Sequence, residues 1–336
     1  MSAATIRDVA KQAGVGVGTV SRVLNDSPSV RKVTRQSVLA AIEKLDFHPS
    51  PLARRLSLGK TLTIGAVAPF FTRPSFVERL RGVEAALADT EYDLLVYNVE
   101  TPEKRDRCLQ EIPKSRRVDG ILIIAFPPSD EDVKSFRAAE LPVVLINDSP
   151  TSLSRVMVDD VNGGYIATQH LLEIGHRKIA YISDPLTSPF NFTSSRYRYR
   201  GYRKALSENE VPFRPAYHRA DEHGREQARQ MTHQLLDLDD PPTAIFAASD
   251  TQAMGVLEAA RERDISIPET LSVIGYDDIK IAEYLDLTTI HQPLFESGWQ
   301  GTHLLLRIIE TGKTESLCDQ LPIELVVRGT TAPPSF

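Results

Sequence analysis

Several features that define common classes of protein are scarce or missing in this 336-residue sequence. No run of apolar residues is long enough to cross a membrane. The two cysteines, Cys108 and Cys318, have neither metal-ligand spacing nor a histidine signature beside them, so we expect free thiols and no metal or other cofactor. Residues 1–4 do not resemble a signal peptide. We therefore expect a cytoplasmic protein without a membrane segment.

The sequence also lacks the signatures of common enzyme classes. It contains no G-x-S-x-G elbow, no Walker A loop, no zinc-binding pair and no dinucleotide fingerprint. Two acidic doublets, Asp159-Asp160 and Asp277-Asp278, stand at the ends of predicted strands, but neither has a partnered histidine at helical spacing. We therefore expect no enzymatic activity.

Charge is distributed unevenly along the chain. Residues 1–60 contain ten Lys or Arg against four Asp or Glu, a balance of +6, whereas the whole chain carries −6 and the remainder therefore −12. A basic head on an acidic body is typical of a protein that contacts nucleic-acid phosphates at one end only.

Residues 5–25 carry two short helical patterns separated by a glycine, which predict a helix-turn-helix. Thr5 and Asp8 form the signature of a capping box at the start of the first helix. Gly14 supplies the left-handed residue that ends this helix. Each helix has an apolar face for packing, and these faces comprise Ile6, Val9, Ala10 and Ala13 in the first helix and Val20, Val23 and Leu24 in the second.

A third helical pattern opens at Thr34 and can close the small core of the first two. Pro49 and Pro51 then break the pattern, and Pro51 is suited to the first turn of a new helix. That segment, residues 50–57, is too short to be stable alone, so we expect a helix only against a partner helix or DNA. From these spacings alone, a generic three-helix domain followed by an ordinary linker is the alternative.

Residues 61–332 alternate between short β-branched runs and helical patterns, which predicts parallel β-α-β units. The runs are residues 62–68, 92–97, 120–125, 143–147, 179–183, 244–248 and 272–276, and the helical patterns are residues 77–88, 164–173 and 252–263. A body of this length is commoner as two sub-domains than as one sheet.

Long motifs along nearly the whole chain resemble the lactose repressor/galactose repressor (LacI/GalR) family of bacterial transcription factors. The N-terminal motifs are T-I-R-D-V-A-K-Q-A-G-V, T-V-S-R-V-L-N, the T-R at residues 34–35, and P-S-P-L-A-R-R-L. The motifs in the body are V-D-G-I-L-I, G-H-R-K-I-A-Y-I, P-T-A-I-F-A-A-S-D-T-Q-A-M-G, S-V-I-G-Y-D-D and L-T-T-I-H-Q-P.

This resemblance implies an all-α helix-turn-helix domain (residues 1–49), a hinge helix and linker (residues 50–60), and an α/β body resembling periplasmic binding proteins (residues 61–332). The body would have two doubly wound lobes joined by crossovers near Asp160, Pro293 and Leu321. Lobe 1 would comprise about residues 61–160 and 294–320, and lobe 2 about residues 161–293 and 321–332. A transport-type binding protein would share this body, but it would need an export signal and would not begin with a basic helix-turn-helix.

The resemblance also implies how DNA is bound. Residues 17–24 would enter the major groove, where Arg22 is the best candidate for bidentate recognition of a guanine. Residues 50–57 would pair across a homodimer and insert Leu56 into the minor groove of a pseudo-palindromic operator. The expected DNA-contacting residues are Thr5, Val17, Thr19, Ser21, Arg22, Asn25, Arg31, Lys32, Ala53, Arg54 and Leu56.

Some positions depart from the usual family pattern. Gly16, Val17 and Gly18 stand where many members carry a serine and a polar pair, so two hydrogen-bonding side chains could be missing. Arg31 and Lys32 replace a common serine or acid, and we expect them to contact phosphates without reading bases.

A small-molecule effector is expected at the carboxyl ends of the strands. Asp277 directly follows a predicted strand and can accept hydrogen bonds from two sugar hydroxyls, although it could instead cap the next helix. Asp250 reads as a helix cap, which leaves Ser249 as the better pocket residue. Phe190 is a weaker candidate for stacking on a ligand. The expected effector-binding residues are Phe76, Asn147, Phe192, Arg198, Ser249, Asp277 and Gln292.

These patterns together predict a homodimeric, operator-binding repressor of carbohydrate-metabolism genes, controlled by a sugar bound between the lobes. A purine is the alternative effector. The arginines around Arg198, at positions 196, 200 and 203, also allow an RNA-binding or second DNA-binding patch. Because no heptad tail follows the last predicted strand, we expect a dimer and not a tetramer.

Overall fold

The computed structural model describes residues 4–24, 26–47, 59–147, 152–187, 189–190, 192–313 and 316–335. The chain divides into two compact units, Met1–Thr61 and Leu62–Phe336, which are taken separately below. The expected hinge helix and four of the expected DNA contacts lie outside the described residues, namely Asn25, Ala53, Arg54 and Leu56.

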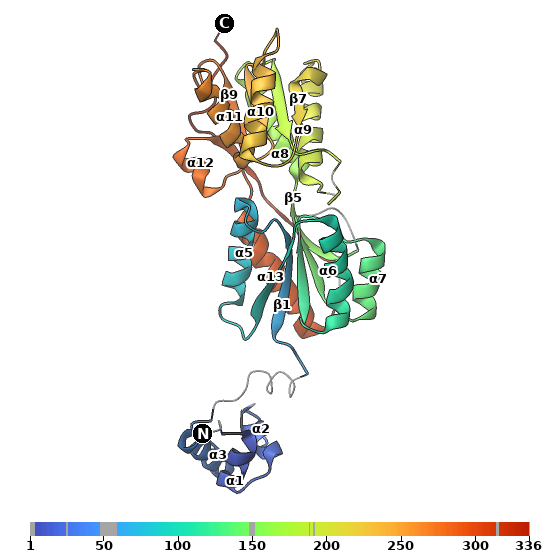
Figure 1. Ribbon diagram of the computed structural model, residues 1–336, viewed down its shortest axis with the longest axis vertical. Helices are drawn as coiled ribbons and strands as arrows, with labels where there is room; N and C mark the ends of the chain where they lie inside the picture. The colour runs from blue at the N-terminus through green and yellow to red at the C-terminus, as the bar shows by residue number, and fades with distance from the viewer. Residues whose placement is uncertain are drawn as a thin grey trace. The chain divides into compact units, whose positions relative to one another are not determined.

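The first unit, called here the helix-turn-helix unit, consists of α1 (Ile6–Ala13), α2 (Val17–Leu24) and α3 (Lys32–Lys44) (Figure 1). The capping box is confirmed, because the carboxylate of Asp8 accepts hydrogen bonds from the Thr5 amide at 2.9 Å and the Thr5 hydroxyl at 2.7 Å. Gly14 has the predicted left-handed conformation, with φ of 67°. Buried Val9, Val20 and Val38 join the three helices in one apolar core.

The third helix starts earlier than predicted. It begins at Lys32, two residues before Thr34, and its N-cap residue Arg31 makes no side-chain capping hydrogen bond. Because no capping side chain marks this N-terminus, the start of α3 could not be predicted from the sequence.

Lobe 1 of the body is a six-stranded sheet with helices on both faces (Figure 1). Its strand order is β11-β5-β4-β3-β1-β2, and all its strand pairs are parallel. The strands are β1 (Thr63–Pro69), β2 (Asp93–Val99), β3 (Gly120–Ile124), β4 (Val143–Ile146), β5 (Ser154–Val158) and β11 (Cys318–Leu321). The helices are α5 (Pro74–Leu87) and α13 (Leu294–Thr311) on one face and α6 (Pro102–Ser115) and α7 (Asp130–Ala138) on the other.

Lobe 2 repeats this architecture with a second six-stranded sheet in the order β12-β10-β9-β8-β6-β7. Only β12 is antiparallel, in its pairing with β10. The strands are β6 (Ile179–Ser183), β7 (His218–Ala220), β8 (Ala244–Ala247), β9 (Ser272–Asp277), β10 (Thr288–His291) and β12 (Glu324–Val326). The helices are α8 (Asp160–Glu173), α9 (Ser194–Glu208), the short 3-10 helix η1 (Pro215–Tyr217), α10 (Arg225–Leu236), α11 (Asp250–Glu262) and α12 (Lys280–Tyr284).

The chain passes between the two sheets three times, between β5 and α8, between β10 and α13, and between β11 and β12. The predicted two-lobed α/β body is therefore observed, with each sheet buried between helices. Fully buried strands such as β3 and β8 form the centre of the sheets. Among the described helices, none combines the length and apolarity needed to cross a bilayer.

Candidate functional site

A small cavity lies between the lobes, at the carboxyl ends of strands from both sheets. Its volume is about 70 Å³. It brings together all seven residues that the sequence assigned to the effector, namely Phe76, Asn147, Phe192, Arg198, Ser249, Asp277 and Gln292. The cavity is smaller than the roughly 300 Å³ typical of ligand pockets, so a sugar-sized molecule requires the lobes or their side chains to move.

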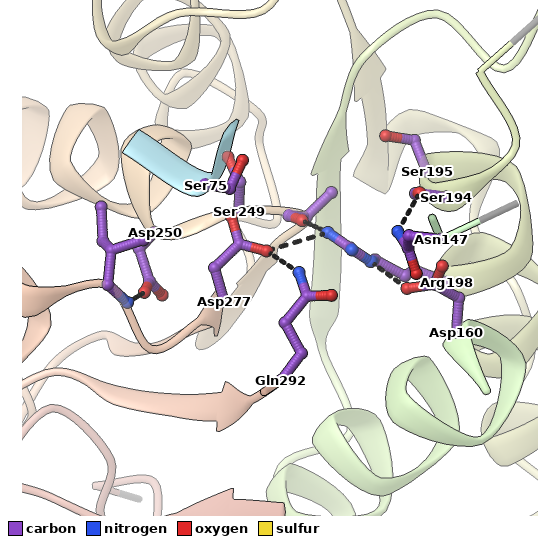
Figure 2. A network of polar contacts seen from close by, with 12 residues as sticks. Ser75, Asn147, Asp160, Ser194, Ser195, Arg198, Ser249, Asp250, Asp277 and Gln292 are labelled. Atoms are coloured by element: carbon purple, nitrogen blue, oxygen red, sulfur yellow. Dashed lines mark hydrogen bonds and ion pairs between the residues drawn. The ribbon is translucent and has the colours of Figure 1, made fainter. Parts of the chain in front are cut away.

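Arg198 lies at the centre of the lobe 2 wall, buried between two carboxylates (Figure 2). Its Nε donates to Oδ1 of Asp160 at 2.8 Å, and its Nη1 donates to the carbonyl of Ala248 at 2.6 Å. The same Nη1 lies 3.6 Å from Oδ1 of Asp277. Burial lowers the pKa of Arg198, but the nearby acidic groups, of which Asp160 has the largest effect, raise it by more. The pKa of Arg198 therefore lies above its usual value. Arg198 is therefore a fixed cation.

Asp277 ends β9 and is held by contacts within lobe 2. Its Oδ1 accepts a hydrogen bond from Nε2 of Gln292 and faces Arg198 (Figure 2). Burial raises the pKa of Asp277, while the charges of Arg198 and Arg79 oppose the rise. The carboxylate points into the cavity network, and it does not cap the next helix, whose N-cap residue is Ile279.

The helix cap before α11 is a correction to the sequence-based assignment. Ser249 is the N-cap residue, because its hydroxyl accepts from the amide of Gln252 at 3.2 Å, and it also lines the cavity. Asp250 is the first residue of the helix and is fully buried, and it accepts from the Ile279 amide at 2.9 Å and the Thr289 hydroxyl at 2.6 Å. Burial and then the charge of Asp277 raise its pKa well above the usual value. Asp250 thus fixes the loop after β9 and does not cap α11.

Close contacts between helices hold the two cationic walls of the cavity. A Cβ on Gly201 of α9 would lie 2.1 Å from the Val161 carbonyl of α8, so only glycine allows this approach, which sets Arg198 beside Asp160. In lobe 1, a Cβ on Gly298 of α13 would lie 1.9 Å from the carbonyl of Arg79 on α5. Both helix pairs therefore require glycine at the crossing.

The lobe 1 wall contains two arginines that the sequence analysis did not identify, Arg73 and Arg79. Arg73 is the N-cap residue of α5, and Arg79 is only 3% exposed on the same helix. A signal for Arg79 was available, because it lies three residues after Phe76 and four before Val83, on the apolar face of the helix. A charged residue on such a face is rarely buried unless it is paired or has a functional role.

Three further polar residues of lobe 2, also not identified from the sequence, line the cavity beside Ser249. Asp184 accepts from Nδ1 of His223 at 3.0 Å and from Nε2 of Gln252 at 3.1 Å. Burial alone would raise the pKa of Asp184, but its hydrogen bond to His223 and the nearby positive charges hold it below the usual value. No sequence pattern indicates this cluster, because its three members come from separate segments of the chain.

The two phenylalanines of the segment before α9 have different roles. Phe192 lines the cavity and stacks on Phe190, with ring centroids 5.1 Å apart. Phe190 does not line the cavity, which corrects its assignment as a ligand-stacking candidate. It is buried in the apolar cluster of lobe 1 and lies 5.5 Å from Phe70, so lobe 2 inserts one side chain into the core of lobe 1.

The arginines around Arg198 lie apart from the cavity. Arg198 is buried, whereas Arg203 is exposed and lies 3.8 Å from the centre of the Phe213 ring. Arg196 and Arg200 both lie about 5.7 Å from the ring centre of Tyr197. Of the four arginines, only Arg198 lines the cavity.

In the helix-turn-helix unit, α2 exposes one side of its surface. Val17 is 42% exposed and Arg22 is exposed, whereas Thr19 and Ser21 are half-buried. The other side packs into the core through Val20 and Val23. The expected phosphate contacts, Arg31 and Lys32, are exposed at the start of α3, and Thr5 is exposed with its hydroxyl bound to Asp8.

Gly16, just before α2, and Gly18, within it, leave room that larger side chains would occupy. A Cβ built on Gly16 or Gly18 has nothing within 4 Å, so the fold does not require glycine at either position. Both cysteines are free, with Cys108 half-buried and Cys318 exposed. Within the described residues, no group of three or more His, Cys, Asp or Glu is arranged to hold a metal ion.

Two family profiles match this chain. The profile of bacterial regulatory proteins of the lacI family matches residues 5–50. The profile of the periplasmic binding protein-like domain matches residues 168–331. The first match covers all three helices of the helix-turn-helix unit, and the second covers most of lobe 2 together with α13 and the C-terminal strands.

Curated proteins are similar over nearly the full length. Catabolite control protein A of Priestia megaterium is 31% identical over 331 residues, with 97% of this chain and 99% of that protein covered. The HTH-type transcriptional repressor PurR of Haemophilus influenzae (strain PittEE) is 36% identical over 335 residues, with 97% and 98% covered.

Solved structures agree with this similarity. The lac repressor dimer bound to operator and the anti-inducer ONPF has a TM-score of 0.86 and 28% identity, with 98% of this chain and 100% of that chain covered. The complex of the transcriptional regulator CelR with cellobiose has a TM-score of 0.73 and 29% identity, with 97% and 99% covered.

Proposed function

This chain belongs to the lacI family of bacterial regulatory proteins and is a DNA-binding transcriptional regulator, and from that premise we propose that it is a homodimeric repressor whose operator affinity is set by an effector in the cavity between the lobes. We expect the effector to be a sugar and the regulated genes to serve carbohydrate metabolism, with a purine as the alternative. Because such a protein works on chromosomal DNA, we also expect it in the cytoplasm.

The observation that carries the proposal is the composition of the cavity. Its walls come from both lobes, with Phe76 and Asn147 from lobe 1 and Arg198 and Asp277 from lobe 2. A ligand that contacts both lobes can favour one angle between them. It changes DNA affinity only if its contacts differ between the two states, since equal affinity for both would shift nothing.

Two of the similar proteins support parts of this proposal. One solved structure is a regulator in complex with cellobiose, which favours a sugar as the effector. PurR is named as a transcriptional repressor, which favours repression. The hydrogen-bonding groups of Asn147 and Asp277 suit hydroxyls, and Phe76 offers an aromatic surface. We place the DNA contacts on the exposed side of α2, around Val17 and Arg22, and expect the hinge residues Ala53, Arg54 and Leu56 to bind the minor groove.

An effector screen followed by operator titration tests this function. Sugars, polyols and nucleobases are screened by thermal shift, because a ligand that binds only the folded state raises the melting temperature. Asp277→Asn keeps the shape but removes charge, and the loss of charge-assisted hydrogen bonds should cost about 1.5–3 kcal/mol each. We expect this variant to bind operator normally without effector and to fail to respond at concentrations that switch the parent.

The control is Glu78→Gln, a half-buried residue of α5 that does not line the cavity, and it should keep the parent response. A full response by Asp277→Asn would remove the carboxylate from the effector site. Loss of operator binding without effector would make Asp277 a structural residue.

The DNA contacts are tested by comparing Arg22→Ala with the double variant Arg31→Ala and Lys32→Ala. Loss of a bidentate base contact should cost about 1–3 kcal/mol on the operator and little on random DNA. Loss of two phosphate contacts should weaken both DNAs alike and lower the log-log salt slope by about two. Fluorescence anisotropy over a salt series measures both effects, and a variant pair that behaved identically would contradict these roles.

A further inference from the structure

Arg79 is a buried cation that no described carboxylate neutralises at ion-pair distance. It is 3% exposed, and its two donated hydrogen bonds go to neutral oxygens, Ser75 O at 3.2 Å and Gln292 Oε1 at 3.1 Å. Its Nε has no hydrogen-bond partner. Arg198, which is equally buried, has Asp160 at 2.8 Å. Burying a charge without a counter-ion is costly, so Arg79 needs a reason to be kept.

A second arginine of lobe 1, Arg73, also lacks an anionic partner among the described residues. Arg73 is half-buried at the cavity, and its guanidinium lies 4.1 Å from the centre of the Phe70 ring. The guanidinium makes no hydrogen bond or ion pair with any described residue, although the backbone of Arg73 bonds to Phe70. Burial lowers the pKa of Arg73, and the charge of Asp184 opposes this. Ser75 and Phe76 of the first turn of α5 also line the cavity, so the positive end of the helix dipole adds to the field of both arginines.

The carboxylates of the cavity already have hydrogen-bond donors from lobe 2, so they can accept an effector hydroxyl but do not need a cationic ligand. Asp184 accepts from His223 and Gln252, and Asp277 accepts from Gln292 and faces Arg198. The capacity that remains unmet is therefore for negative charge, and it belongs to lobe 1. The charge of Asp277 acts on Arg79 only from beyond ion-pair distance, so a neutral sugar would leave Arg79 without a direct anionic partner.

We propose that the effector is a polyhydroxylated anion, whose phosphate or carboxylate binds Arg73 and Arg79 at the N-terminus of α5. Its hydroxyls then contact Asn147 and Ser249 across the cavity. The inference rests on the proposed function, because it names the chemical class of ligand for the same cavity. It also gives the ligand a means of joining the lobes, since the anion binds lobe 1 while Arg198 and Ser249 belong to lobe 2.

Calorimetric titration of the full chain with four probes tests the proposal: inorganic phosphate, glucose 6-phosphate, gluconate and glucose. We expect at least one anionic sugar to bind the parent, and glucose to bind about 10- to 100-fold more weakly, as the loss of one or two charge-assisted contacts implies. Glucose 6-phosphate and gluconate distinguish a phosphate from a carboxylate. Inorganic phosphate shows whether the anion alone is enough.

The decisive variant is Arg79→Met, which keeps an unbranched side chain and removes the charge. It should lose the preference for the anionic sugar and, without ligand, melt no lower than the parent, because an uncompensated buried charge is removed. Arg81→Met is the matched control on the same helix, since Arg81 is exposed and pairs with Glu78 at 2.7 Å. The control should keep the full preference. If Arg79→Met did not fold, Arg73→Ala would test the same preference from the more exposed end of the site.

Three results would overturn the proposal. They are no binding of any anionic probe by the parent at millimolar concentration, equal binding of glucose and its anionic derivatives, and an unchanged preference in Arg79→Met. Failure of the proposed function can be distinguished from failure of this proposal, because the calorimetric titration measures ligand binding in the absence of DNA. An anion that bound without changing operator affinity would contradict the proposed function. Operator release or binding controlled by a neutral ligand alone would contradict only the proposal that the effector is an anion.

Discussion

The two walls of the cavity differ in how their charges are balanced. In lobe 2, Arg198 has two carboxylate neighbours, Asp160 and Asp277, and both are buried with it. In lobe 1, Arg73 and Arg79 have no ion-pair partner among the described residues. The lobe 2 wall is thus held by its own contacts, whereas the arginines of the lobe 1 wall have no described carboxylate at ion-pair distance and can gain one from a ligand. Changes to the two walls should accordingly affect stability and ligand binding differently.

The difference does not come from the backbone, because both lobes use the same device to bring helices together. Gly201 allows α9 to approach α8, and Gly298 allows α13 to approach α5. Each lobe then presents one buried arginine to the cavity, Arg198 or Arg79. What distinguishes the walls is the presence of Asp160 beside the first arginine and only neutral oxygens beside the second.

The largest effect on stability is expected from Asp160→Asn, which leaves Arg198 with a neutral neighbour. Breaking a buried ion pair by removing one partner costs about 3–5 kcal/mol, and both side chains here are 6% exposed. Urea unfolding monitored by circular dichroism measures the loss. Glu78→Gln is the control in lobe 1, where the exposed pair with Arg81 should contribute less than about 1 kcal/mol. Equal losses in both variants would mean that the lobe 2 wall is not held by this pair.

A smaller effect is expected from Gly201→Ala, which tests the helix crossing and not the charges. The added Cβ would lie 2.1 Å from the Val161 carbonyl, and such overpacking costs about 1–3 kcal/mol. Because Arg198 lies one turn earlier on α9, effector binding should weaken as well. Gly18→Ala is the control, since nothing lies within 4 Å of its added atom and stability should rise by at most about 1 kcal/mol. A stable Gly201→Ala variant would show that the helices can separate without loss.

The helix-turn-helix unit could be predicted from the sequence because its signals are local. The bounds of α2, residues 17–24, agree with the structure, and the Thr5–Asp8 capping box and Gly14 mark α1 directly. The start of α3 was wrong because Arg31 and Lys32 offer no capping side chain. Strands such as β7, which is short, polar and partly exposed, carry no apolar alternation and were not predicted.

The cavity could be predicted only in part. Asp277 ends one buried strand and Ser249 comes just after another, so the rule that ligands bind at carboxyl ends of strands identifies them, and the family resemblance supplies Arg198. Arg79 was missed although it lies on the apolar face of α5, because only the packing of α5 against α13 shows that this position is buried. The role of Asp250 was wrong for a similar reason, since its partners Ile279 and Thr289 are distant in sequence.

The smallest expected effect is a loss of stability at acidic pH, which should be greater in lobe 2 because of a buried histidine. His176 of lobe 2 is 1% exposed, with Nδ1 2.8 Å from the Thr243 hydroxyl and Nε2 2.9 Å from the Ala332 carbonyl. Burial lowers its pKa from 6.5, so the unfolded chain binds more protons than the folded one between the two pKa values. The contribution of His176 to stability is therefore fully present above about pH 6.5 and is lost as the pH falls toward the folded pKa, by up to about 1.4 kcal/mol per pH unit.

Hydrogen exchange measured near pH 7 and near pH 5.5 should accordingly show lobe 2 opening more readily in acid than lobe 1, with a slope of about one proton from His176. His291 acts in the opposite direction, because its hydrogen bond to Asp278 raises its pKa, so the comparison has to isolate one residue. His176→Gln should remove part of the acid sensitivity of lobe 2, whereas His303→Gln on α13 should leave it unchanged. If the parent and His176→Gln lost protection equally on acidification, His176 would not be the source, and the acid response would have to come from other groups such as His170 and His218 of lobe 2, whose pKa values burial also lowers.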